Sequence, residues 1–108
     1  MATVVWTIRA QKEKRILYLE GRLKFGVSTA KKLAQKITRI QDSLENFPEL
    51  GYRESLMENV SRIYRARVIN KRYKLIYRYE EDIDTVYIED IWDTRRAPDN
   101  LIKRINKK

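Results

Sequence analysis

The sequence predicts a single α+β domain over residues 1–108, in which an antiparallel helical hairpin packs on one face of a three- to four-stranded antiparallel sheet. Two observations predict this class. After one short N-terminal strand, the first half of the chain has helical periodicity, whereas the second half alternates at period two between short turns. Consecutive strands with short connections pair antiparallel, which leaves one face of the sheet for the helices to cover.

The first predicted elements are a strand and a helix. Residues 4–8 are mostly β-branched and predict a short strand. From about residue 9 to residue 24 the pattern becomes helical, with Ile16, Leu19 and Leu23 at positions i, i+3 and i+7. Gly26 suits the left-handed residue that follows the end of a helix.

A second helix has the strongest helical signal in the chain. Ser28 or Thr29 is its predicted N-cap, and it ends near Asn46 because the residue before Pro48 avoids the α region. Its apolar stripe, with Gln41 as the one polar member, consists of Ala30, Leu33, Ala34, Ile37, Ile40 and Leu44. The connection between the two helices is short, which favours an antiparallel hairpin.

The second half of the chain predicts the sheet. Strands are expected at residues 55–59, 60–69, 73–79 and 85–92, with turns at residues 70–72 and 80–84. Pro98 suits the first turn of a short C-terminal helix that runs to about residue 105.

The composition indicates a folded basic protein. The formal net charge is +9, and 43% of the residues are hydrophobic. Such a charge suggests an anionic partner, namely nucleic acid, a membrane surface or an acidic protein, although charge that serves only solubility is the alternative. Cysteine and histidine are both absent, which removes thiolate metal sites and the commonest general base. We therefore expect a cytoplasmic protein without metal, cofactor, signal peptide or membrane segment.

The stretch VSRIYRARVINKRYKLIYRY, residues 60–79, contains seven cations, four tyrosines and no acid. Strand alternation suggests that Arg65 and Arg67 share an open face with Lys74 and Arg78, while the tyrosines face the helices. Arginine binds phosphate through two parallel hydrogen bonds and lysine acts as a point charge, so this face predicts anion binding. The alternative is a solvated face that the acids of residues 80–84 neutralise.

Two further arginines, Arg95 and Arg96, follow the last predicted strand beside Asp93. They predict either a phosphate clamp or an Arg–Asp brace, and a brace would occupy only one of the two guanidinium groups. Without histidine or cysteine, a catalytic base would have to be Asp, Glu, Lys or Tyr, and no spacing brings Glu54, Glu58 and Asp93 together. The residues themselves therefore favour anion binding over catalysis.

Four strings in this order resemble a known family: FPELG at residues 47–51, YRARV at 64–68, YKLIY at 73–77 and IWDTRRAP at 91–98. Together with the helical hairpin, they resemble the RelE/ParE superfamily of toxins from bacterial type II toxin–antitoxin modules, over nearly the whole chain. The resemblance implies the RelE-like fold and a cytoplasmic toxin. It also implies a cognate acidic antitoxin as partner, with a monomer, a dimer or a heterotetramer with the antitoxin as possible assemblies.

The resemblance leaves two targets open. RelE-like members cleave mRNA on the ribosome, and ParE-like members bind and inhibit DNA gyrase. By motif, the RelE-type catalytic positions fall on Arg65, Arg67, Lys74 and Arg95, or on Arg96 if the register shifts by one. The C-terminal tyrosine position falls near Leu101, and leucine cannot take a proton.

The sequence thus favours a non-enzymatic, ParE-like gyrase inhibitor. The alternatives are a metal-independent endoribonuclease that cleaves ribosome-bound mRNA, and a non-catalytic basic module that binds nucleic acid. In each of these functions, the residues expected to bind the anion or partner are Arg65, Arg67, Lys74, Arg78, Arg95 and Arg96.

Overall fold

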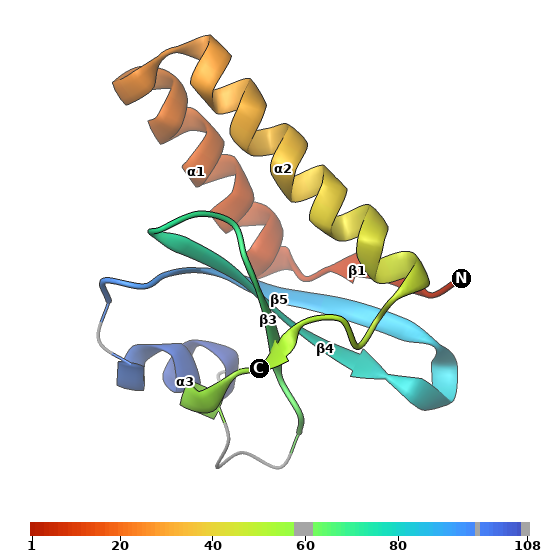
Figure 1. The fold of residues 1–108 in the computed structure, drawn as a ribbon. Coiled ribbons are helices and arrows are strands. Elements are labelled where there is room, and N and C mark those ends of the chain that lie inside the picture. The colour runs from red at the N-terminus through yellow and green to blue at the C-terminus, as the bar shows by residue number, and fades with distance from the viewer. Residues whose placement is uncertain (58–61, 97, 107–108) are drawn as a thin grey trace.

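The computed structural model describes residues 1–57, 62–96 and 98–106. A helical hairpin lies on one side of a twisted sheet and a short C-terminal helix lies on the other (Figure 1). The helices are α1 (Ile8–Phe25), α2 (Val27–Asn46) and α3 (Pro98–Asn106), and Ser55–Met57 and Glu81–Ile83 form two short 3₁₀ helices, η1 and η2. The strands are β1 (Thr3–Trp6), β2 (Tyr52–Arg53), β3 (Arg65–Val68), β4 (Tyr73–Glu80) and β5 (Thr85–Asp93). The predicted α+β class with its hairpin and C-terminal helix is confirmed.

The sheet has five strands in the order β1-β5-β4-β3-β2. The four strands that follow the hairpin pair antiparallel; this pairing was expected, but β2 was not among the expected strands. β1 joins them as a fifth strand, parallel to β5. Because the connection from β1 to the rest of the sheet passes through both long helices, it is long enough for a parallel crossover. The expected strand at residues 55–59 is wrong for Ser55–Met57, which forms η1, while Glu58 and Asn59 lie outside the described residues.

The hairpin turns at a single residue. Thr7 caps α1, since its Oγ1 accepts a hydrogen bond from the Ala10 amide at 3.2 Å. Gly26 has a φ of 91°, a conformation that side-chain-bearing residues rarely adopt, and it ends α1 and begins α2. The predicted N-cap at Ser28 or Thr29 is therefore wrong, because α2 already starts at Val27. Its end at Asn46 is as predicted.

The core of the hairpin side is built mainly from α2. As predicted, the stripe of α2 is buried at Ala30, Ile37, Ile40 and Leu44. In α1, by contrast, the buried residues are Ala10 and Leu17, and the predicted stripe of Ile16, Leu19 and Leu23 is exposed. With 3.6 residues per turn, Leu19 lies about 200° around the helix from Leu17, so the two cannot share a face.

The opposite face of the sheet is also covered. Trp92, Ile76 and Ala66 pack there against Met57 of η1 and against α3. Helix α3 contacts this second cluster through Leu101, which is fully buried, and Ile105, which is almost fully buried. The face of the sheet that we expected to be open is therefore partly covered, because α3 packs against it.

Gly51, in the loop after α2, lies in close contact with β3 and β4. Its amide donates a hydrogen bond to the Tyr77 hydroxyl at 2.8 Å. A Cβ at this position would lie 2.6 Å from the carbonyl oxygen of Ala66, which is too close for any other residue. The loop after α2 therefore depends on a glycine to approach β3 and β4.

Candidate partner-binding site

The basic residues of β3 and β4 lie on two different faces of the sheet. The register pairs Arg65 with Tyr77 and Arg67 with Leu75, so both arginines share the hairpin face with those core residues. Lys74 and Arg78 alternate with them and lie on the α3 face. The expectation of one open face carrying all four cations is wrong, although the tyrosine row of β4 does face the helices as predicted.

On the hairpin face, Arg65 and Arg67 connect β3 to the end of α2. Arg65 Nη1 donates to the Gly51 carbonyl at 3.0 Å, and its Nη2 lies 4.0 Å from Glu49 Oε2. Arg67 Nη1 donates to Ser43 Oγ at 3.0 Å. Both guanidinium groups are partly buried and hold neighbouring backbone and side chains in place.

On the α3 face, Lys74 and Arg78 are paired with buried acids. Lys74 Nζ lies 2.6 Å from Glu54 Oε2, and Arg78 Nε lies 2.9 Å from Glu89 Oε1. The side chains of both glutamates are 1% exposed. Arg78 also pairs with Glu80, the only one of these three acids that belongs to the turn in which we expected the neutralising charge. These cations therefore balance internal carboxylates.

A bulge in β5 supplies one of the acids. Between Ile76 and Tyr77 the register shifts, so that Glu89 is the additional residue between Ile88 and Asp90. An additional residue in one strand changes the face of the sheet toward which the neighbouring side chains point. Glu89 and Asp90 both become buried, and Asp90 accepts two hydrogen bonds from Arg104 of α3, at 2.8 and 2.9 Å. Burial raises the pKa of Asp90 against the opposing effect of Arg104.

Arg95 and Arg96 differ in their partners. Arg95 donates to both carboxylate oxygens of Asp93, at 3.1 and 2.9 Å, and these bonds are the main reason why the pKa of Asp93 falls to about 2. The predicted brace thus forms, and it engages one arginine. Arg96 makes no ion pair within the described residues, and its guanidinium carbon lies 5.9 Å from the centroid of the Trp92 ring.

The hairpin is a second basic region of the chain, in addition to residues 60–79. Helices α1 and α2 contain ten Lys and Arg and four Asp and Glu, a net charge of +6 out of the +9 of the chain. Nine of these ten cations are exposed: Lys12, Lys14, Arg15, Arg22, Lys24, Lys31, Lys32, Lys36 and Arg39. Counting charge by predicted element would have revealed this asymmetry.

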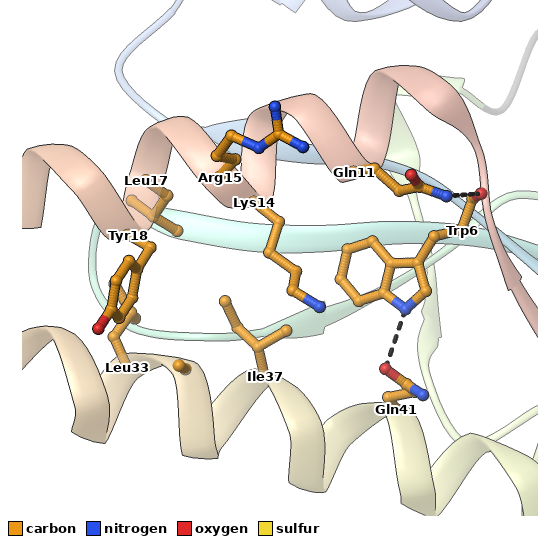
Figure 2. Close-up of a pocket in the computed structure, with 10 residues that line it drawn as sticks. Trp6, Gln11, Lys14, Arg15, Leu17, Tyr18, Leu33, Ile37 and Gln41 are labelled. Carbon is orange, nitrogen blue, oxygen red and sulfur yellow. Dashed lines mark hydrogen bonds between the residues drawn. The ribbon is translucent and has the colours of Figure 1, made fainter.

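A groove of about 590 Å³ runs between α1 and α2 at the end near β1 (Figure 2). Its walls are apolar at Leu17, Leu33 and Ile37. Trp6 lies at one end, where its Nε1 donates to Gln41 Oε1 at 2.9 Å. Lys14 Nζ lies 4.5 Å from the centroid of the Trp6 ring. An apolar groove with cations at its edge suits an amphipathic segment with acidic residues.

The structure places the residues of the expected RelE-type site on two faces of the sheet and at the end of β5. Arg65 and Arg67 lie on one face of the sheet, Lys74 lies on the other, and Arg95 is paired with Asp93. Leu101 is fully buried in the second core cluster. Within the described residues, no three His, Cys, Asp or Glu side chains are grouped so that they could hold a metal ion. No helix there has the length and apolar character that crossing a membrane requires.

The fold is similar to several solved toxins. One is the chromosomal ParDE system from P. aeruginosa, with a TM-score of 0.68 and 18% identity over 86% of this chain and 96% of that chain. The YoeB dimer from Staphylococcus aureus has a TM-score of 0.59 and 19% identity, over 88% of this chain and 98% of the other. The isolated E. coli RelE toxin has a TM-score of 0.55 and 17% identity, over 97% and 99% respectively.

Among curated proteins, none matches the sequence. The family model described as the ParE toxin of type II toxin–antitoxin systems, parDE, matches residues 4–98. This range includes both long helices and all of the sheet except Thr3, the first residue of β1. The chain therefore belongs to the ParE toxin family, and it is the toxin of a type II toxin–antitoxin system within the RelE/ParE superfamily.

Proposed function

We propose that this toxin binds and inhibits DNA gyrase in the cytoplasm, without cleaving RNA, and that a cognate acidic antitoxin neutralises it. The observation that carries the proposal is the separation of the RelE-type positions. Arg65 and Arg67 share the hairpin face, whereas Lys74 is paired with Glu54 on the α3 face. A nuclease without a metal needs its phosphate-binding groups and its base around one scissile bond.

The second candidate function is cleavage of ribosome-bound mRNA. It is favoured by Arg95 and Arg96, which lie exposed just after the end of β5, where the RelE-type arginine is expected. Against it stands Leu101, an apolar side chain with 0% exposure near the expected position of a catalytic tyrosine. The pairing of Arg95 with Asp93 also reduces the charge available to a phosphate.

The helical hairpin is the proposed contact surface of the antitoxin. Its net charge of +6 would attract an acidic chain, and the groove between α1 and α2 would receive apolar side chains of that chain. Nine Lys and Arg side chains of the hairpin are exposed, whereas Lys74 and Arg78 on the strands are paired with buried glutamates.

The two target hypotheses can be separated with the purified wild-type chain and two assays. A gyrase inhibitor should block supercoiling of relaxed plasmid and leave mRNA intact in a cell-free translation reaction. A ribonuclease should give mapped cleavage of ribosome-bound mRNA and leave supercoiling unchanged, and that second result would overturn the proposal. In the nuclease case, Arg95→Ala should lower the cleavage rate by about 10²–10³, while Arg39→Ala, on the exposed face of α2, should not.

A further inference from the structure

Two adjoining cavities lie between the turn of the hairpin and the β3–β4 turn, and the larger of them shares Leu17 and Leu33 with the groove of Figure 2. One has a volume of about 300 Å³ and the other about 130 Å³. Five residues line both: Leu17, Glu20, Lys24, Arg72 and Tyr73. The two cavities therefore lie next to each other, as a large and a small compartment on either side of these residues.

The two compartments differ in chemistry. Phe25, Ala30 and Leu33 make the large compartment mainly apolar, and its volume is at the lower end of the range of about 300–1,000 Å³ that is typical of small-molecule sites. The small compartment is mainly polar, and Arg95 and Arg96 line it in addition to the shared residues. An apolar chamber beside a cationic one suits a ligand with a flat ring and an anionic group.

Arg72 is the central residue of this site. Its Nε is buried and has no hydrogen-bond partner among the described residues, although a buried N–H without a partner is costly. Its guanidinium carbon lies 5.5 Å from the centroid of the Tyr73 ring. Arg72 is thus a buried, unsatisfied donor on the shared wall of both compartments.

The backbone at Arg72 is held firmly. The Asn70 side chain accepts hydrogen bonds from the amides of Arg72 and Tyr73, at 2.8 and 2.9 Å. The Arg72 carbonyl accepts a hydrogen bond from the Thr94 amide at 2.7 Å, which ties the turn to the end of β5. A binding arginine placed in advance in this way loses less freedom when a ligand binds.

The small compartment keeps an excess of positive charge after internal pairing. Its cations are Lys24, Arg72, Arg95 and Arg96, and its acids are Glu13, Glu20 and Asp93. Asp93 is paired with Arg95, and Glu13 with Arg104 at 3.1 Å. Lys24, Arg72 and Arg96 then face only Glu20, so the compartment suits a phosphate group with two negative charges.

From these observations we infer that the toxin has a mononucleotide site: the phosphate binds to Arg72 and Arg96, and the base occupies the apolar compartment against Phe25 or Tyr73. Arginine binds phosphate through its forked N–H groups, and aromatic rings stack on any base. A free nucleotide and the 5′-phosphorylated end of a nucleic acid strand share this chemistry. The toxin would have this site whether gyrase or mRNA is its cellular target.

Isothermal titration of the isolated full-length chain with 5′-AMP, adenosine and inorganic phosphate tests this site. 5′-AMP should bind at least tenfold more tightly than either fragment. Arg72→Gln should weaken binding of 5′-AMP by about tenfold or more, whereas Arg39→Gln, which removes the same charge from the outside of α2, should change it by less than about twofold. Thr29→Phe, which fills the large compartment, should abolish the advantage of 5′-AMP over phosphate.

The same titration distinguishes a free nucleotide from a strand end. It uses a tetranucleotide with a 5′-phosphate and the same strand with a 5′-hydroxyl. Tighter binding of the phosphorylated strand than of 5′-AMP would identify a strand end, and the reverse a free nucleotide. If Arg72→Gln fails to fold by circular dichroism, Arg96→Gln replaces it, because Arg96 is exposed. Binding of 5′-AMP no tighter than phosphate, or equal loss in the Arg39→Gln variant, would overturn the inference.

Discussion

The charged residues of the central strands serve mainly as internal counterions. Lys74 is 13% exposed and lies 2.6 Å from Glu54, whose side chain is 1% exposed. A buried carboxylate is tolerated only with a paired charge or hydrogen bonds, and Glu54 also accepts a hydrogen bond from the Leu56 amide at 3.1 Å. In this structure, Lys74 is needed to keep Glu54 inside the protein.

Lys74→Met should therefore destabilise the fold by about 3–5 kcal/mol, because it leaves the Glu54 charge buried and uncompensated. The double variant Glu54→Gln/Lys74→Met should recover much of that loss, since no charge remains to be buried. Urea denaturation measures both free energies of unfolding. The matched control Lys71→Met lies in the exposed β3–β4 turn and should stay within about 0.5 kcal/mol of the wild type. Full stability of Lys74→Met with lost toxicity would instead indicate a functional lysine.

At the scale of elements, α2 behaves as its sequence predicts and α1 does not. Six apolar positions on one stripe leave α2 a single choice of buried face. In α1, small and large apolar residues are spread around the helix, and the structure buries Ala10 and Leu17 while Leu23 remains 88% exposed. The buried face of α1 therefore follows from its packing in the fold, which a count of large apolar side chains cannot reveal.

Ile37→Ala in α2 should cost about 2–5 kcal/mol, because Ile37 is 2% exposed in the main core. Leu23→Ala in α1 removes a side chain of equal size from an exposed position and should change stability by no more than about 0.5 kcal/mol. Thermal or urea unfolding of the two variants is a direct comparison of the two helix faces. Equal losses would mean that the hairpin buries the α1 stripe after all.

The sequence could predict which side chains share a face of the sheet only within each strand. Tyr73, Leu75 and Tyr77 share a face as expected, and so do Arg65 and Arg67. What could not be predicted is which of these rows face the same way, because the turn at residues 70–72 sets the register between β3 and β4. The Asn70 side chain fixes that turn through two backbone amides. For the same reason, the convergence of site residues from different strands could not be predicted.

At the scale of the molecule, one ionic network links three elements. Arg104 of α3 binds Asp90 of β5 through two hydrogen bonds and lies 3.1 Å from Glu13 of α1. The C-terminal helix is thus tied to the sheet and to the hairpin by charge as well as by Leu101 and Ile105. With these internal cations paired, nine of the exposed cations that a partner meets lie on the outside of α1 and α2.

This distribution predicts how the antitoxin should bind. Lys14 and Arg15 line the groove between the helices, whereas Lys71 and Lys103 are exposed in the β3–β4 turn and on α3. Lys14→Gln/Arg15→Gln should weaken the complex with the cognate antitoxin by about tenfold or more and reduce its dependence on salt, because exposed charges act through a screened field. The matched control Lys71→Gln/Lys103→Gln loses the same charge and should change affinity by only about twofold to threefold. Titration at two salt concentrations measures both effects. If the two double variants lost affinity equally, the net charge of the toxin, and not the hairpin groove, would determine antitoxin binding.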